Sequence, residues 1–134
     1  MNAAAEYIYG EAEPGLFAKY LSDFGRNDEA IAFAKAHLQK ASIEEQPILL
    51  NYWANALTFK ALPNANKEAL ALYQEAVRIK PDYWIGYNNS LLALSNLGRE
   101  EELAQLAQQM IKNAGGRPGR APEEMYQPYD HACP

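Results

Sequence analysis

The stretch NKEALALYQEAVRIKP, residues 66–81, carries the clearest helical pattern in the chain. Its apolar side chains recur at steps of three and four residues, the spacing of one face of an α-helix: Ala69, Leu70, Tyr73, Ala76 and Val77. Asn66 is a candidate N-cap, and Pro81 is a stop signal. The stretch therefore predicts an amphipathic helix that buries one face against its neighbours.

Five further helices extend the same plan along the chain, and strand patterns are nearly absent. The predicted helices cover residues 16–24, 27–40, 47–61, 83–97 and 100–114. In the last of these helices, the residues expected to face inward are Leu103, Leu106, Ala107, Met110 and Ile111. The sequence leaves open whether residues 2–9 form a short additional helix. The six helices pair into three hairpins.

Local signals mark the ends of these helices. Gly25 and Gly98 each follow a helical pattern and can end it in a left-handed conformation. Asn27 is a candidate cap for the helix that follows Gly25. Residues 42–45, Ser-Ile-Glu-Glu, have the spacing of a capping box, although Pro47 competes with them as a first-turn proline of the same helix.

The three hairpins are related by an internal repeat. Small or apolar residues just inside the second helix of each pair, Ala30, Ala69 and Leu103, are separated by 39 and then 34 residues. The five extra residues of the first interval fit around the turn at 42–47 and the loop at 63–66. A helical hairpin recurring about every 34 residues is a known period of repeat proteins.

Large and small residues recur at matching places in these hairpins. The first helices carry Phe17-Ala18 and Leu21, then Leu50, Trp53-Ala54 and Leu57, then Tyr87, Ser90-Leu91 and Leu94. The second-helix pattern of alanine, an aromatic residue four later and then proline is complete only in Ala69, Tyr73 and Pro81. Small residues let two helices approach closely, and large residues fill the gaps between hairpins.

This pattern resembles the tetratricopeptide repeat family, with about three repeats that are degenerate in the first and third. The resemblance implies an all-α fold of three stacked antiparallel helical hairpins, a right-handed α-solenoid. It covers residues 14–115, preceded by an N-terminal segment, 1–13, and followed by an irregular proline- and glycine-rich tail or linker, 116–134. The alternative is an irregular helical bundle in which the 34-residue spacing is accidental.

The tail differs from the rest of the chain in composition. Four of the eight prolines fall in the last 20 residues, so this segment cannot continue a helix. Its composition is typical of a linker or a flexible end. Met125, Tyr126 and Tyr129, set among prolines and acidic residues, also resemble a short docking motif. A third interpretation is that the chain is a fragment of a longer protein.

Composition restricts the function classes. With 12 Lys and Arg against 17 Asp and Glu and no basic cluster, a nucleic-acid partner is not expected. No apolar run is long enough to cross a membrane, and residues 1–10 lack the pattern of a signal peptide. The single cysteine, Cys133, cannot form an internal disulfide. A cytoplasmic protein without a membrane partner is therefore expected, unless a targeting segment precedes these residues.

Catalytic and metal-binding patterns are weak. His37 lies in a predicted helix without a cysteine or serine partner and is expected to be a partly buried packing residue. Asp130, His131 and Cys133 are too few for a structural zinc site. The acidic run Glu100–Glu102 suits a helix start, where it complements the helix dipole. We therefore expect no enzyme activity, no cofactor and no metal.

The resemblance implies that a peptide binds in the concave groove lined by the first helix of each hairpin. The groove candidates are Lys19 and Ser22, then Asn51, Tyr52, Asn55 and Thr58, then Asn88, Asn89, Leu92 and Asn96. Asparagine is a modest helix former, and its amide can both donate to and accept from a peptide backbone. The alternative is that these amides solvate an exposed helix face or hold contacts between helices.

The expected function is a protein–protein interaction module that binds an extended peptide or partner protein in this groove. The alternative is a substrate-recognition or regulatory repeat region of a larger enzyme, such as a glycosyl-, sulfo- or methyltransferase, with its catalytic domain outside this chain. Self-association as a homodimer, through the terminal helices or the tail, is also open, because three hairpins are near the minimum for a stable array.

Overall fold

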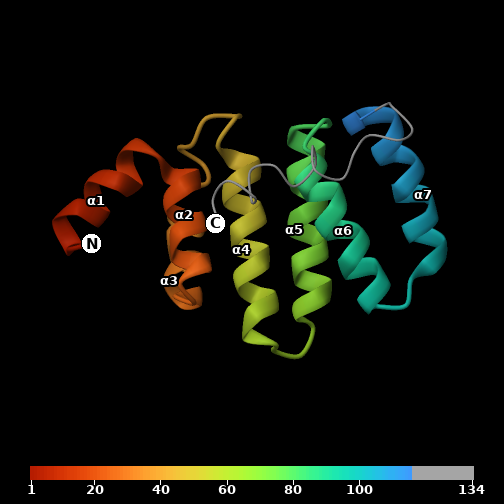
Figure 1. Ribbon diagram of the computed structural model, residues 1–134, viewed down its shortest axis with the longest axis horizontal. Coiled ribbons are helices and arrows are strands. Elements are labelled where there is room, and N and C mark those ends of the chain that lie inside the picture. The colour runs from red at the N-terminus through yellow and green to blue at the C-terminus, as the bar shows by residue number, and fades with distance from the viewer. Residues whose placement is uncertain (116–134) are drawn as a thin grey trace, which may run out of the picture.

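The computed structural model describes residues 1–115 (Figure 1), and within that range it is entirely helical, without a β-strand. The prediction of an all-α fold is confirmed. The helices are α1 (Ala3–Ala12), α2 (Pro14–Asp23), α3 (Asn27–His37), α4 (Gln46–Lys60), α5 (Ala65–Ile79), α6 (Trp84–Asn96) and α7 (Glu100–Met110), with a π-helical turn, η1 (Ile111–Gly115), after α7. The tail predicted for 116–134 lies outside the described residues.

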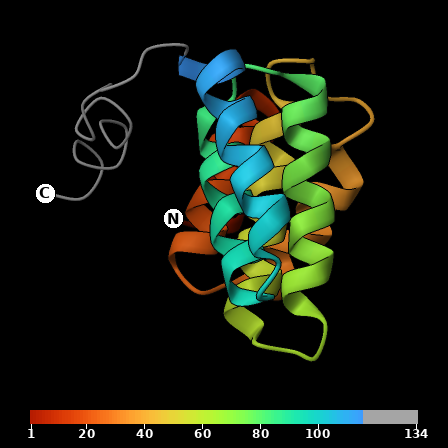
Figure 2. The ribbon, with the colours of Figure 1, turned by 90° about the vertical axis from the view of Figure 1, so that its right-hand side faces the viewer.

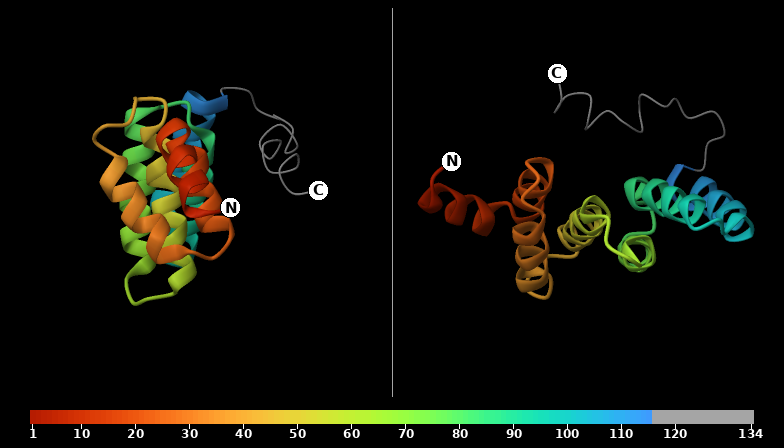
Figure 3. Two further views of the ribbon diagram at one scale, coloured as in Figure 1. Left: turned by 90° about the vertical axis from the view of Figure 1, so that its left-hand side faces the viewer. Right: turned by 90° about the horizontal axis from the view of Figure 1, so that it is seen from below.

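Helices α2 to α7 pack as three consecutive pairs: α2 with α3, α4 with α5, and α6 with α7. Each pair also contacts the next, because α4 packs on both α2 and α3, and α6 packs on α5. The view from below in Figure 3 shows α2, α4 and α6 on one side of the row and α3 and α5 on the other. The side formed by α2, α4 and α6, which faces the viewer in Figure 1, is called the front face below.

Of the predicted signals at the helix ends, the two glycines are confirmed and the two asparagine caps are not. Gly25 and Gly98 have φ angles of 74° and 72°, in the region that glycine adopts without a steric penalty. The predicted caps Asn27 and Asn66 are wrong, because Arg26 and Asn64 hold the N-cap positions. Asn64 itself takes a left-handed conformation, with φ 67°, so α5 begins directly after it.

Glu45 ties the first two hairpins together. Its backbone N–H donates to the Ser42 hydroxyl at 3.2 Å, but α4 begins only at Gln46 with Pro47 in its first turn. The first-turn proline therefore marks the helix start, and the predicted capping box at 42–45 is wrong. The Glu45 carboxylate accepts a hydrogen bond of 2.8 Å from the backbone N–H of Gly15, in the first turn of α2. An added Cβ at Gly15 would collide with this carboxylate and with Ile48. The glycine therefore permits the close approach of the α4 entry to α2.

Completely buried alanines lie where the helices pack on one another. Ala18, Ala34, Ala54 and Ala69 are all completely buried, on α2, α3, α4 and α5 respectively. Tyr73 is 4% exposed and lies in a cluster with Ala54 and Ala69 of its own hairpin and with Ala93 and Leu94 of α6. The prediction that Tyr73 fills the gap between two hairpins is confirmed.

The last helix is less well covered than the sequence predicts. None of its residues is fully buried, and Leu103, Leu106 and Met110 are only partly buried against the core. Ile111, predicted to face inward, is 52% exposed. Figure 2 shows α7 as the outermost helix of the row, so only its inner side has a packing partner.

Replacing Tyr73 with alanine should lower the free energy of unfolding by about 3–5 kcal/mol, because it empties the junction of the second and third hairpins. Tyr73→Phe keeps the ring and removes only the hydroxyl that donates to Asn55 Oδ1 at 2.5 Å, so it should cost about 0.5–1.5 kcal/mol. Urea denaturation followed by circular dichroism measures both. Tyr7→Ala, at a position that is 70% exposed, is the control. Equal losses for all three variants would contradict the assignment.

Candidate functional site

The front face contains a cavity of about 430 Å³, a size suited to a ligand side chain or short peptide segment. It is open at the surface and largely apolar, and five of its lining residues are aromatic. We call it the aromatic cavity. Its lining residues come from α1, α2, α4 and the start of α6: Tyr9, Leu16, Lys19, Tyr20, Asp23, Phe24, Ile48, Tyr52, Tyr83 and Ile85.

A chain of ring contacts fixes the α1–α2 side of the cavity. Phe17 is buried and stacks on Tyr20, with ring centroids 5.8 Å apart and an interplanar angle of 19°. Tyr20 in turn contacts Phe24 at 4.9 Å, and Tyr9 of α1 meets the edge of Phe17 at 5.5 Å. Such contacts restrict the orientation of the rings. Phe24, at the outer end of the chain of rings, is 72% exposed.

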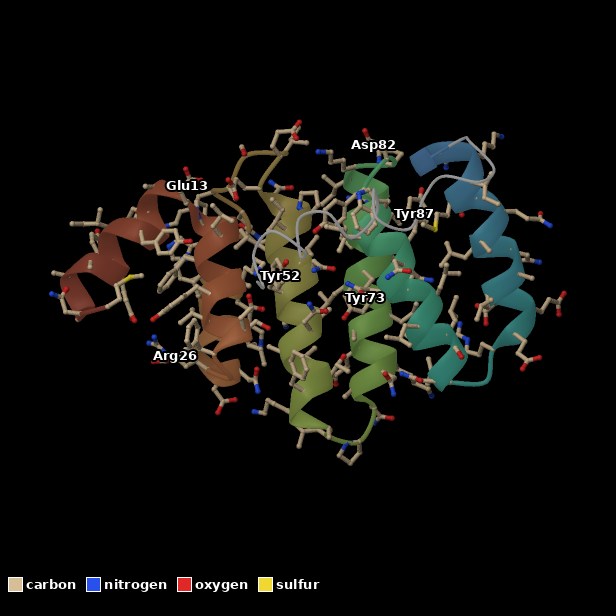
Figure 4. All side chains as sticks on the ribbon, in the orientation of Figure 1. Glu13, Arg26, Tyr52, Tyr73, Asp82 and Tyr87 are labelled. Carbon is tan, nitrogen blue, oxygen red and sulfur yellow. The ribbon has the colours of Figure 1, made fainter. Side chains whose placement is uncertain are left out.

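Tyr52 forms the floor of the cavity where α4 meets α2, and Figure 4 labels it between these two helices. It is 5% exposed and belongs to a cluster with Ala18, Ala34 and Leu49. Because its neighbours on three helices hold the ring, this part of the floor is rigid.

One ion pair lies in the wall. Lys19 Nζ is 2.5 Å from Asp23 Oδ2, one turn along α2. A cation and an anion side by side in an otherwise apolar cavity offer both a donor and an acceptor to a bound backbone. Pairs of this kind at a partly exposed site add little to stability.

Helix α1 supplies Tyr9 and is held in place by Arg26. The Arg26 guanidinium donates to both carboxylate oxygens of Glu6, at 2.6 and 3.0 Å, and also pairs with Glu29. These hydrogen bonds lower the pKa of Glu6 from its ordinary value of 4.5. On the same helix Gly10 lies so close to Phe33 that an added Cβ would be 2.9 Å from the Phe33 ring. Figure 4 labels Arg26 near the end of α2.

Two of the residues predicted to line a groove, Lys19 and Tyr52, do line the aromatic cavity. Ser22, from the same prediction, is 3% exposed and buried in α2. Thr58 is exposed, and its hydroxyl donates to the Ala54 carbonyl at 3.1 Å. The cavity therefore uses only part of the predicted set.

Two of the asparagines predicted to line the groove, Asn51 and Asn89, are bonded to each other, and the prediction is wrong for the buried Asn51. Asn51 is completely buried, and its Oδ1 accepts a hydrogen bond of 2.8 Å from Asn89 Nδ2. The two amides thus join α4 to α6 inside the molecule. Asn55 also has a partner within the chain, because its Oδ1 accepts from the Tyr73 hydroxyl. These side chains hold helices together, the alternative that the sequence left open.

The remaining candidates lie on α6, away from the cavity lining. Asn88 is half-buried, and Asn96 is exposed. Leu92 is 61% exposed. They stay predicted contact residues, and none of them lines the aromatic cavity.

Sequence reasoning missed most of the cavity, although a signal for it was present. Leu16, Tyr20 and Phe24 are four residues apart and form a second apolar stripe on α2, distinct from the buried Phe17 and Leu21. One apolar stripe is enough for a short helix to pack on the core, so a second stripe on the same helix needs another explanation. The second stripe marks the cavity.

His37 has a structural role. Its ring stacks on Phe33 with centroids 3.9 Å apart, and its Nδ1 lies 3.0 Å from the Phe33 carbonyl oxygen. Its Nε2 is 3.7 Å from the Glu11 carboxylate of α1. The prediction of a partly buried packing residue is confirmed.

No group of three or more His, Cys, Asp or Glu side chains within residues 1–115 is arranged to hold a metal ion. None of the helices in that range has both the length and the apolar character to cross a membrane.

Comparisons with protein-family models, with curated proteins and with solved structures give no significant match to this chain. The tetratricopeptide resemblance therefore stays a prediction from the residues themselves.

Lowering the pH should loosen α1 specifically. Because the pKa of Glu6 is lower in the folded state, the Arg26–Glu6 pair stabilises α1 above the ordinary pKa of 4.5 and this stabilisation is lost as pH falls through the folded pKa. The protection factors of the α1 amides, which are exchange rates corrected for the intrinsic slowing at low pH, should therefore fall more between pH 6 and 3 than those of the α4 amides. Glu6→Gln should show fast exchange in α1 already at pH 6 and a flatter pH dependence. Identical pH profiles for wild type and variant would contradict this role.

Asn89→Ala should lower the free energy of unfolding by about 1–3 kcal/mol, because it leaves the buried Asn51 Oδ1 without a donor. Asn51→Leu replaces the buried amide with an apolar side chain of similar size and should cost less. In the Asn51→Leu background, Asn89→Ala should then have almost no further effect. Denaturation midpoints of the two single variants and the double variant form a double-mutant cycle. Strictly additive losses would show that the two amides do not interact.

Proposed function

We propose that this chain is a protein–protein interaction module, built as a tetratricopeptide-like array of three hairpins, whose front face binds an extended peptide. The observation that carries the proposal is the aromatic cavity, which is lined by the first helix of all three hairpins, α2, α4 and α6. An extended segment laid across these helices meets each hairpin in turn.

The lining favours recognition of side chains over recognition of the peptide backbone. Concave sites that are mostly apolar with a few polar groups are typical ligand sites. Here the apolar part comes from rings and aliphatic side chains, and the polar part from the Lys19–Asp23 pair. Three amides that would have held a backbone, Asn51, Asn55 and Asn89, are bonded within the chain. We therefore assign the main contact to a bulky apolar or aromatic residue of the peptide, seated between Tyr20, Phe24 and Tyr52.

Rigid aromatic anchors support tight binding at low entropic cost. Tyrosine and phenylalanine have few rotatable bonds, and residues of this kind provide much of the energy at protein interfaces. The packing of Tyr20 between Phe17 and Phe24 already restricts its ring. Less freedom is then lost when a partner binds.

Peptides selected from a random display library on the wild-type protein test the proposal. Phe24→Ala should lower the affinity for a selected peptide about 30-fold, which corresponds to the loss of a contact worth about 2 kcal/mol. It should leave the free energy of unfolding nearly unchanged, because Phe24 is 72% exposed. The matched control is Phe59→Ala, which removes another exposed phenylalanine of a first helix, 67% exposed and outside the cavity. Calorimetry measures both affinities. Equal losses in the two variants, or peptides indifferent to Phe24→Ala, would refute the proposal.

A further inference from the structure

The end of η1 lies against the start of α6, one of the elements that line the aromatic cavity. Asn113 Nδ2 is 3.4 Å from the hydroxyl of Tyr87, and that hydroxyl donates to the Pro81 carbonyl at 2.9 Å. These contacts place η1 against the first turns of α6. Tyr83 and Ile85, from the same end of α6, line the cavity. The described chain therefore ends near the start of α6, the element that supplies Tyr83 and Ile85 to the cavity; this start is the upper end of α6 in Figure 1.

The residues that follow have the chemistry of a ligand for such a cavity. Residues 118–129 contain three prolines together with Met125, Tyr126 and Tyr129. Proline-containing segments dock into grooves lined by aromatic residues, because proline is already restricted to an extended conformation. Methionine sulfur also makes favourable contacts with aromatic rings.

The length of this segment suits the distance. The ten residues from Gly115 to Met125 span up to about 33 Å when extended. Packed helices lie roughly 8–10 Å apart, so this length reaches from the start of α6 across α4 to α2. A second copy of the chain is not required for the contact.

We infer that residues 121–130 of the same chain occupy the aromatic cavity as an internal ligand, with Met125, Tyr126 and Tyr129 as the apolar contacts. The inference rests on the proposed function, because it uses the same cavity and the same class of peptide. It adds regulation, since an external peptide binds only after the internal segment leaves. An internal ligand that fills the cavity nine-tenths of the time lowers the apparent affinity of an external peptide about tenfold.

The full-length chain offers a direct test, because Cys133 is its only cysteine. A nitroxide spin label on Cys133 lies four residues from Tyr129 and should broaden the amide signals of α2 and α4 residues around the cavity. The signals of α3 and α5, on the other side of the row, should change much less. Uniform broadening of both sides, or none, would overturn the inference.

Variants within the segment separate a specific contact from simple proximity. Tyr126→Ser combined with Tyr129→Ser should abolish the broadening and raise the affinity of a selected external peptide about tenfold. The matched control is Tyr7→Ser, which removes an exposed tyrosine outside the cavity and should change neither. If the double variant behaves like the control, the segment is not the ligand.

Mixing the chains distinguishes an internal contact from one between two copies. Spin-labelled chain without isotope, added to isotope-labelled chain without the spin label, should give no broadening. Broadening in the mixture would replace the internal ligand with a second copy and overturn the inference. If no broadening occurs in any sample but selected peptides still depend on Phe24, the internal ligand is refuted and the proposed function stands.

Discussion

The close contact between helices at completely buried alanines is the constraint on which the rest of the structure depends. Ala18 and Ala34 bring the helices of the first hairpin together, and Ala54 and Ala69 do the same in the second. A larger side chain at any of these places would separate the pair. Because the paired helices are so close, bulk is needed only at the junctions between hairpins, where Tyr73 lies. The row of first helices on the front face follows from this alternation of small and large residues.

The helices could be predicted because their signals are local. Periodicity of apolar residues places a helix, and a glycine with positive φ, as at Gly25 and Gly98, ends it. The exact first residue of each helix could not be predicted, because several polar residues in one turn can take the N-cap position. In α5 that position is held by Asn64 and not by Asn66. The exposure of Ile111 could not be predicted either, because periodicity identifies an apolar helix face but does not show whether a neighbouring helix covers all of it.

The candidate site was harder to predict, for a geometric reason. Adjacent residues on a helix point about 100° apart, so a small error in rotation exchanges the groove and the core. Asn51 and Tyr52 show this: the tyrosine lines the cavity, while the amide beside it bonds to Asn89 inside the molecule. The residue type did not settle the question either, because the amide of a helical asparagine can bond equally well to a peptide backbone and to a neighbouring helix. The stripe of Leu16, Tyr20 and Phe24 was the better signal, since an apolar face without a core partner needs another explanation.

The two sides of the cavity are held by different forces, and this bears on what the site accepts. Around Tyr52 the wall is packed against buried residues of three helices, where changes in volume are costly. On the α1 side, Tyr9 depends on a helix with a single buried residue, Gly10, and on a charged pair between Glu6 and Arg26 that is partly exposed. Such pairs hold weakly compared with a packed core. For the peptide proposed to bind here, the α4 side is therefore the wall that would select the shape of a side chain, whereas α1, with Tyr9, is the more weakly held wall.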